Sequence, residues 1–206
     1  AGVVPLQAPL GEADASRWEE AGRASLAALI GDRPIALAWT AGTPDRHGRR
    51  VARITLADGR WLEGALVEQG VLRAQWLPGE EDCFGALLPL EATARAHAAG
   101  AWADPAHAIV GADDPSLRTR NGLYELVEGK VVSVGHGNRM VFLDFGSDVR
   151  HDFTVMVPLG VSEAMAGAGV DVDSLAGRRV RVRGIIEDSG GPAIRLNDRL
   201  EIELID

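Results

Sequence analysis

The stretch VARITLADGRWLEGALVEQG, residues 51–70, places a strand, a tight turn and a helix in direct succession. Val51 to Leu56 is rich in β-branched and aliphatic residues, which favours a strand. Asp58-Gly59 is a pair typical of a hairpin turn leading into residues 60–62. A short helix is predicted from Glu63 to Gln69, and Gly70 is a residue type that commonly ends helices.

Working outward, the apolar spacing predicts three more elements in the first half of the chain. They are a helix over 12–30 that Gly31 ends, a short strand over 34–39, and a helix over 87–98. Pro89 is expected in the first turn of the last helix, where its missing N–H costs nothing. Residues 43–50 are polar and typical of a turn, and residues 79–82 are expected to form an acidic loop.

The spacing of apolar residues changes in the second half of the chain, from a helical period to alternation. Residues 105–120 contain little apolar periodicity and predict a linker between domains at 1–104 and 121–206. Alternation then predicts strands over 127–134, 140–145, 153–157, 178–186 and 193–204, with a helix over 161–168. Three strands, a helix and two strands follow the element order of an OB-type barrel. The predicted class is α+β, mostly β.

Composition narrows the function classes. The chain has 206 residues, 46% apolar and 25% charged, with a net charge of −9. This profile excludes a collagen, a disulfide mini-protein and a wholly disordered chain. Cys83 is the single cysteine, so an intramolecular disulfide and a cysteine zinc cluster are excluded. No apolar run approaches the roughly 20 residues of a membrane span, and the acidic balance argues against high-affinity nucleic-acid binding.

An ordered set of short motifs resembles the staphylococcal-nuclease (thermonuclease) family. Asp45-Arg46-His47-Gly48-Arg49 is similar to the family's D-x-Y-G-R turn, which a strand, a D-G turn and an A-L-V-x-x-G helix follow. Asp58-Gly59 and Ala65–Gly70 stand in that order here, and Leu90–Arg95 with Gly100-x-Trp102 match the last helix and a G-x-W ending. The resemblance covers about residues 1–104. It implies an OB barrel with three helices that cuts DNA or RNA with Ca²⁺, a glutamate and two arginines.

Only some of the family's catalytic and nucleotide-binding residues have counterparts in this sequence. Arg49 occupies the position of one catalytic arginine, His47 stands where the family has a nucleotide-contacting tyrosine, and Trp76 falls near a second aromatic position. The alternatives are a structural Arg49 that pairs with Asp45 or caps a loop, and packing for Trp76. The stretch 3–10, where the family's metal-binding carboxylates are expected, contains none. Without them Ca²⁺ lacks charged ligands, so Arg49 is a vestigial catalytic residue and no metal site is predicted.

The second domain resembles the OB-like tail of some bacterial thermonuclease-like proteins. The resemblance rests on residues 128–131, 141–146, 152–155 and 175–184. The strand Arg179-Val180-Arg181-Val182-Arg183 would place three guanidinium groups on one face, suited to a phosphate backbone or an acidic partner. The alternative is a salt-bridged face.

Glutamates are available for that alternative, and other polar residues gather in nearby turns. Glu187, Glu201 and Glu203 are the candidate partners of the three arginines. Asp144, Asp148, His151 and Asp152 are interpreted as turn formers rather than metal ligands. Phe142, with the other aromatic residues of this half, is assigned mainly to core positions.

Together these observations predict a catalytically degenerate protein that acts as a binding or structural module. A protein partner in an envelope or membrane-associated assembly is expected, with weak nucleic-acid binding as a secondary role and no cofactor. The alternative is a Ca²⁺-dependent phosphodiesterase whose missing residues lie upstream. The chain lacks the first strands of the resembled family's barrel, and a barrel without them exposes unpaired edges. Three explanations stay open for the missing strands: a longer precursor, strands supplied by a partner, or a domain rebuilt around fewer strands.

Location and oligomeric state are less constrained. Relatives of the resembled family are often exported, and a mature chain that starts at Ala1 fits removal of a signal peptide. A periplasmic or exported location is therefore expected, and a cytoplasmic one stays open. Nothing in the sequence fixes the oligomeric state.

Overall fold

The computed structural model describes residues 2–6, 17–40, 44, 46–148 and 151–205. The chain divides into two compact units, Ala1–Ala108 and Ile109–Asp206, here called the first and second unit. Most of the stretch predicted as a linker belongs to the second unit. Val110 and Leu117 from that stretch are buried in its core, because scattered apolar residues in irregular backbone can fill a core without any periodicity.

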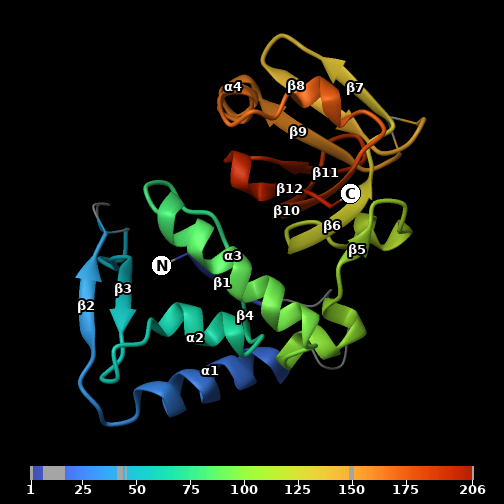
Figure 1. The fold of residues 1–206 in the computed structure, drawn as a ribbon. Helices are drawn as coiled ribbons and strands as arrows, with labels where there is room; N and C mark the ends of the chain where they lie inside the picture. Colours follow the sequence, from blue (N-terminus) through green and yellow to red (C-terminus); the bar gives the residue numbers. More distant parts are fainter. Residues whose placement is uncertain (1, 7–16, 41–43, 45, 149–150, 206) are drawn as a thin grey trace. The chain divides into compact units, whose positions relative to one another are not determined.

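In its described residues, the first unit combines three α-helices with two separate two-stranded sheets (Figure 1). The helices are α1 Arg17–Ile30, α2 Leu62–Glu68 and α3 Glu81–Ala96; the strands are β1 Val3–Pro5, β2 Ala36–Trp39, β3 Ala52–Thr55 and β4 Leu72–Ala74. β1 pairs with β4 and β2 with β3, both antiparallel. The predicted start of α1 at residues 12–16 lies outside the described residues.

The segment 51–70 folds largely as predicted. β3 is followed by a turn in which the Leu56 amide donates to the carbonyl of Arg60 at 2.8 Å, and then by α2. The strand expected after the turn is reduced to one bridge between Thr55 and Trp61. α2 lies between α1 and α3 (Figure 1). Leu62, Leu66 and the flanking Leu29 and Leu56 form the core of this part.

Helix α3 differs from the prediction. It begins at Glu81 rather than Leu87, so Pro89 lies in its interior, and Glu81 and Asp82 of the expected acidic loop belong to its first turn. Glu81 and Asp82 favour the positive end of the helix dipole, and buried Phe84 extends the apolar face one turn upstream. Pro89 is tolerated on the exposed side, although its ring removes the bond to the carbonyl of Gly85.

The second unit is built on an eight-stranded sheet with the order β5-β6-β10-β11-β9-β8-β7, and β12 also pairs with β10. The elements are β5 Val110–Gly111, β6 Tyr124–Lys130, β7 Ser133–His136, β8 Met140–Asp144, β9 Thr154–Pro158, α4 Leu159–Gly167, β10 Arg179–Asp188, β11 Pro192–Arg195 and β12 Ile202–Leu204. β5–β6 and β9–β11 are parallel and the other pairs antiparallel.

Two strands predicted as continuous are interrupted. Val131 and Val132 separate β6 from β7, and a 3₁₀ turn at Arg199–Glu201 precedes β12. The amide of Val131 donates to the carbonyl of Arg178 next to β10, whereas the amide of Val132 donates to Asp144 of β8. Two consecutive residues therefore carry the chain from the β10 side of the sheet to the β8 side.

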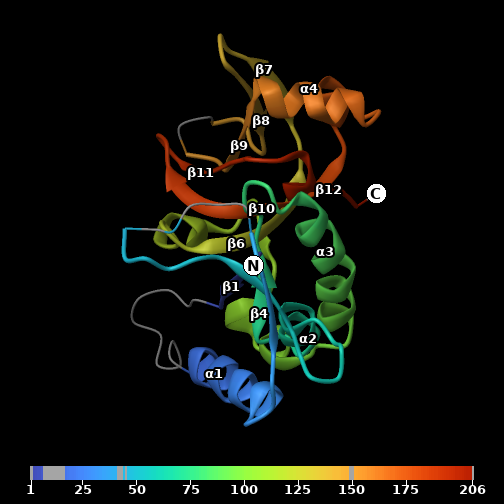
Figure 2. The ribbon, with the colours of Figure 1, turned by 90° about the vertical axis from the view of Figure 1, so that its left-hand side faces the viewer.

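Alternation decides which side chains enter the core of the second unit. Val141 and Leu143 of β8, with Val155 and Val157 of β9, are buried on one face. α4 packs against these two strands (Figure 2). The expected mixed helix and sheet class, mostly sheet, is confirmed, with four α-helices in the described part of the chain. None of the described helices is long and apolar enough to cross a bilayer.

Candidate functional site

The loop between β2 and β3 carries the residues that the sequence assigns to a vestigial catalytic site. Arg49 and His47 are both exposed there. The Nε atom of Arg46 donates to Nε2 of His47 at 3.0 Å. Asp45, the alternative partner of Arg49, lies outside the described residues. The loop therefore presents cationic side chains to solvent.

Trp76 follows β4 in the first unit and is half-buried. Its indole Nε1 is enclosed and meets no acceptor among the described residues. An aromatic platform for a base needs an open ring face. The enclosed indole nitrogen of this half-buried residue favours packing, the alternative given for Trp76 above.

Three glutamates of the first unit tie helices to strands. Glu80 accepts two hydrogen bonds from Arg53 of β3, at 2.9 and 2.7 Å, and these raise the pKa of Arg53. Buried Glu91 of α3 accepts from the Ala74 amide at 2.9 Å. Buried Glu63 of α2 accepts from the Ile54 amide at 3.4 Å. These carboxylates are thus engaged in holding the unit together.

The described residues of both units contain no group of three or more His, Cys, Asp or Glu side chains able to hold a metal ion. Cys83 is buried, and this burial, helped by a hydrogen bond with Glu80, raises the pKa of its thiol. A neutral thiol is a weak nucleophile, so this environment does not favour a nucleophilic role for Cys83.

The arginine strand β10 shows the predicted alternation. Val180 and Val182 are in the core, and Arg181 and Arg183 lie on the other face against carboxylates. Arg181 donates to Glu128 at 2.6 Å and to Glu203 at 3.1 Å. Arg183, itself buried, donates to Glu203 at 2.7 Å. For Arg181 and Arg183, this geometry corresponds to the alternative in which the arginine face is salt-bridged, rather than to a face that binds a phosphate backbone.

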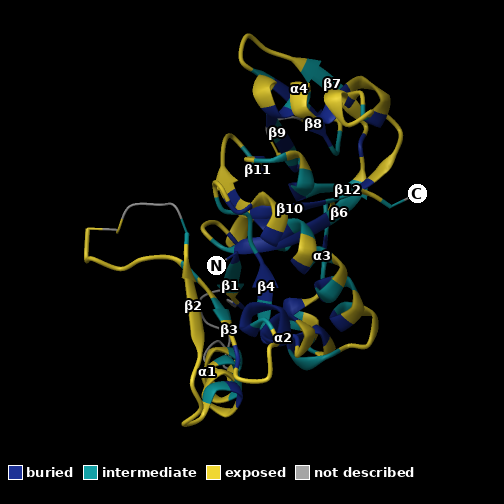
Figure 3. Cartoon of the chain, turned by 60° about the vertical axis from the view of Figure 1, so that its left-hand side comes forward, coloured by how far each residue is buried: buried dark blue, intermediate teal, exposed yellow. Residues whose placement is uncertain are grey.

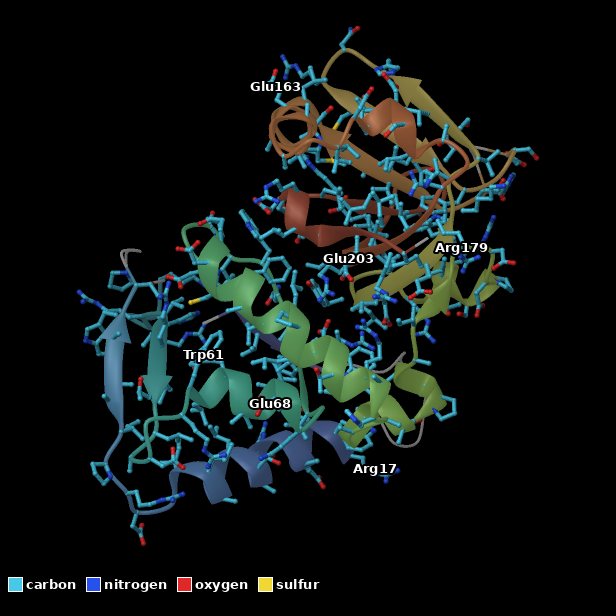
Figure 4. The ribbon with its side chains drawn as sticks, viewed as in Figure 1. Arg17, Trp61, Glu68, Glu163, Arg179 and Glu203 are labelled. Atoms are coloured by element: carbon cyan, nitrogen blue, oxygen red, sulfur yellow. The ribbon has the colours of Figure 1, made fainter. Side chains whose placement is uncertain are left out.

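Arg179, the third arginine of this strand, is exposed and pairs in register with Lys130 of β6. Of the three candidate glutamates, Glu203, labelled in Figure 4, forms ion pairs with Arg181 and Arg183 of β10. Glu201 is buried and accepts from the Asn197 amide at 2.6 Å, and its burial raises its pKa. The sequence prediction missed Glu128, because the register of β6 against β10 is needed to find it.

A pocket of about 330 Å³ lies on the outer face of β7, β8, β9 and β11. It is lined by Gly135, His136, Phe142, Asp144, Asp152, Thr154, Met156, Ser189, Gly191 and Ala193. Phe142 lies opposite Met156 in the β8–β9 register, and Asp144 opposite Thr154. We call this the outer-face pocket.

The polar groups of the outer-face pocket are held in place by neighbours. Asp144 is 9% exposed and accepts from the hydroxyls of Ser133 at 3.3 Å and Thr154 at 3.2 Å. Asp152 accepts from the Asp148 amide at 2.7 Å. His136 lines the pocket, and its Nε2 atom lies 2.7 Å from an oxygen of Asp173, a residue outside the lining.

The sequence interpretation missed this pocket. It assigned Phe142 to the core and the two aspartates to turns, and Phe142 is in fact half-buried on the pocket floor. The available signal was the alternation in β8, which separates Phe142 and Asp144 from core residues Val141 and Leu143.

Comparison with known proteins gives no assignment: no family model matches the sequence, and no curated protein matches it.

Proposed function

We propose that the chain is a degenerate thermonuclease-like protein with an OB-type second unit, and that it acts as a protein-binding module. The order of motifs supports the first unit's assignment. For the second, the support is the strand order, the parallel β9–β11 pair within a mostly antiparallel sheet, and the valine pair that links β6 to β7. OB-type barrels commonly use one outer face for binding.

The main support for protein binding is the β2–β3 ribbon, formed by Ala36–Trp39 and Ala52–Thr55. All four residues of β2 are exposed (Figure 3). Leu37 is 45% and Trp39 57% exposed, and Ile35 precedes them on the same face. Among the described residues, β3 is the one strand that pairs with β2. An apolar strand with an open edge is a template for an added strand.

Charge indicates the chemistry of the partner. Residues 33–60 contain six arginines and two aspartates, although the whole chain has a net charge of −9. Val51, 46% exposed, adds apolar surface next to these cations. The matching ligand is an extended apolar segment with acidic side chains beside it, because opposite charge steers such a segment to the ribbon.

The use of carboxylates in the first unit also supports binding over catalysis. Glu80 and Glu91 are engaged by Arg53 and the Ala74 amide, respectively. A phosphodiesterase of this kind needs carboxylate oxygens directed at a cation. An exported location remains part of the proposal, and fractionation of cells that produce the chain tests it.

The first experiment is a cleavage assay on the full chain. Single-stranded DNA and RNA are incubated with Ca²⁺, and then with a chelator, alongside the Arg49→Ala variant. We expect no cleavage above background. Cleavage that requires both Ca²⁺ and Arg49 would establish the phosphodiesterase alternative.

The second experiment tests the ribbon with a photo-crosslinking residue. It is placed at Leu37 and, as a matched control, at Leu26 of α1, an exposed leucine of the same unit at 39%. We expect a discrete adduct with a protein from position 37 and none from position 26. Equal adducts from both positions, or none from either, would contradict docking on β2.

A further inference from the structure

The outer-face pocket carries a second inference, which concerns the second unit and does not depend on the β2–β3 ribbon. The pocket measures about 330 Å³, within the range of roughly 300–1,000 Å³ found for small-ligand sites. Most of its lining residues lie on strands, Ser189 and Gly191 belong to the β10–β11 hairpin loop, and Asp152 belongs to the β8–β9 connection. The strand-borne part of the pocket is therefore preformed. What it can bind follows from its floor and its charges.

The floor is apolar and aromatic. Phe142 and Met156 are neighbours across the β8–β9 pair, and Ala193 lies in the next strand, β11. Gly135 lies opposite Phe142 in β7. A Cβ atom at Gly135 would approach within 4 Å only the Cβ of Phe142, at 3.9 Å. The glycine therefore leaves space over this part of the floor.

The walls are acidic. Asp144 is nine-tenths buried, and its two hydrogen-bonding partners are the neutral hydroxyls of Ser133 and Thr154. A second carboxylate, Asp152, packs closely on the backbone of Gly146, where an added Cβ would overlap it. Neither aspartate has an ion pair within the described ranges, and no arginine or lysine lines the pocket. A carboxylate so placed is costly unless a cation compensates it.

We propose that the outer-face pocket binds the side chain of an arginine presented by another protein or peptide. The guanidinium donates to Asp144 and Asp152, which suits its forked set of donors. Its flat face lies on the Phe142 ring, which attracts cations. The methylene stem lies along Met156 and Ala193. The two hydroxyls and the Asp148 amide orient the carboxylates before the ligand arrives, which reduces the entropy lost on binding.

One nearby cation provides a discriminating test. Arg195 of β11 pairs in register with Met156, so it lies on the same face, outside the pocket lining. It makes no ion pair in the described residues. Its charge opposes a cationic ligand and would favour a phosphate-bearing one. Replacing it therefore shifts the two classes of ligand in opposite directions.

The experiment is a titration of the ¹⁵N-labelled full chain followed by amide chemical shifts. The probes are N-acetylargininamide and its neutral isostere N-acetylcitrullinamide. We expect saturable shifts at Gly135, Gly191 and neighbouring amides with the arginine probe alone, weakened by salt. Asp144→Asn should weaken binding about tenfold or more, the scale of one charge-assisted hydrogen bond. Phe142→Leu should weaken it several-fold while preserving an apolar floor.

The matched control is Glu163→Gln, which removes an exposed carboxylate of α4 away from the pocket lining (Figure 4). It should leave the affinity unchanged, and the spectra themselves report whether each variant is folded.

Equal shifts with the citrulline probe, or shifts that Asp144→Asn and Phe142→Leu both leave intact, would overturn the proposal. So would saturable binding of a single-stranded oligonucleotide at these amides that Arg195→Gln weakens. The arginine probe should instead bind Arg195→Gln more tightly. Neither result depends on the crosslinking at Leu37, so the two proposals fail separately.

Discussion

Arg183 on β10 donates through Nη2 to Oε1 of Glu203 on β12 at 2.7 Å, and the arginine is only 1% exposed. Glu203 also accepts from Arg181 at 3.1 Å, so one carboxylate serves two guanidinium groups. We expect Glu203→Ala to lower the free energy of unfolding of the second unit by about 2 kcal/mol. This is less than for a fully buried pair, because the Glu203 side chain is 30% exposed.

This prediction needs a signal from the second unit. All five tryptophans lie within residues 1–108, so their fluorescence follows the first unit. Far-UV circular dichroism follows both units, so the part of its transition in a urea titration that does not coincide with the tryptophan transition reports the second unit. Glu187→Ala, an exposed site on the same strand, is the control and should change little. Equal midpoints for the two variants would contradict the assigned role of Glu203.

Gly70 and Gly100 make a close backbone crossing in the first unit. Both have positive φ, +67° and +55°, and a Cβ on Gly70 would overlap the carbonyl of Ala99. We expect Gly70→Ala to cost about 3 kcal/mol or more, from strain and displaced backbone together. Gly59→Ala is the control, since its φ of +83° is strained but nothing lies within 4 Å. Tryptophan fluorescence in urea compares the two, and similar losses would show that the crossing adds nothing.

Pro89 lies in the interior of α3 on its exposed side. Pro89→Ala restores the backbone donor toward Gly85 and removes the ring, and we expect it to stabilise the first unit by about 1 kcal/mol. Ala86→Pro, at an exposed site one turn earlier, should destabilise it by about 3 kcal/mol. The midpoints of urea unfolding check both. A loss of stability on Pro89→Ala would mean that the proline ring makes contacts that outweigh the missing hydrogen bond.

Asp104 predicts a pH dependence. Trp18 Nε1 donates to it at 3.0 Å and the Ala106 amide at 3.1 Å, and these bonds lower its pKa. The carboxylate therefore stabilises the folded first unit above the unfolded pKa of about 3.9, and this contribution disappears as the pH falls through the folded pKa. Asp104→Asn should lose about 1 kcal/mol at pH 7.

The variant should also differ less from the parent chain at pH 2–3 than at neutral pH, because protonation removes the same contribution from the parent. Urea midpoints measured across this range by tryptophan fluorescence provide the test. Asp32→Asn, at an exposed position after α1, is the control. A constant difference at all pH values would show that the charge of Asp104 does not matter.

Local patterns predicted much of the fold. The alternation of β10, the turn at Asp58-Gly59 and the helix that follows β9 were all readable, because each depends on neighbours within a few residues. Helix α3 was predicted too short because Pro89 was given its usual place in a first turn. Tertiary packing of Phe84 and Leu87 extends the helix beyond what local preference indicates.

The sites were harder to predict than the elements. The pairing of Arg181 with Glu128 depends on a register between residues 53 positions apart. Likewise the pocket requires Phe142 of β8 and Ala193 of β11 to share one face of the sheet. They do so because β9 lies between them, antiparallel to β8 and parallel to β11. No local periodicity specifies which strands become neighbours, so these sites could only follow from the assembled sheet.

The pairing of β6 with β10 has a consequence for synthesis of the chain. Val127 finds its partner only at Val182, and β12 joins still later. The first unit is complete at residue 108, so at roughly 5–20 residues per second it leaves the ribosome several seconds before the second can close its sheet. Any chaperone that recognises the edge of β2 left unpaired in the described residues can therefore engage the nascent chain before its second half has folded.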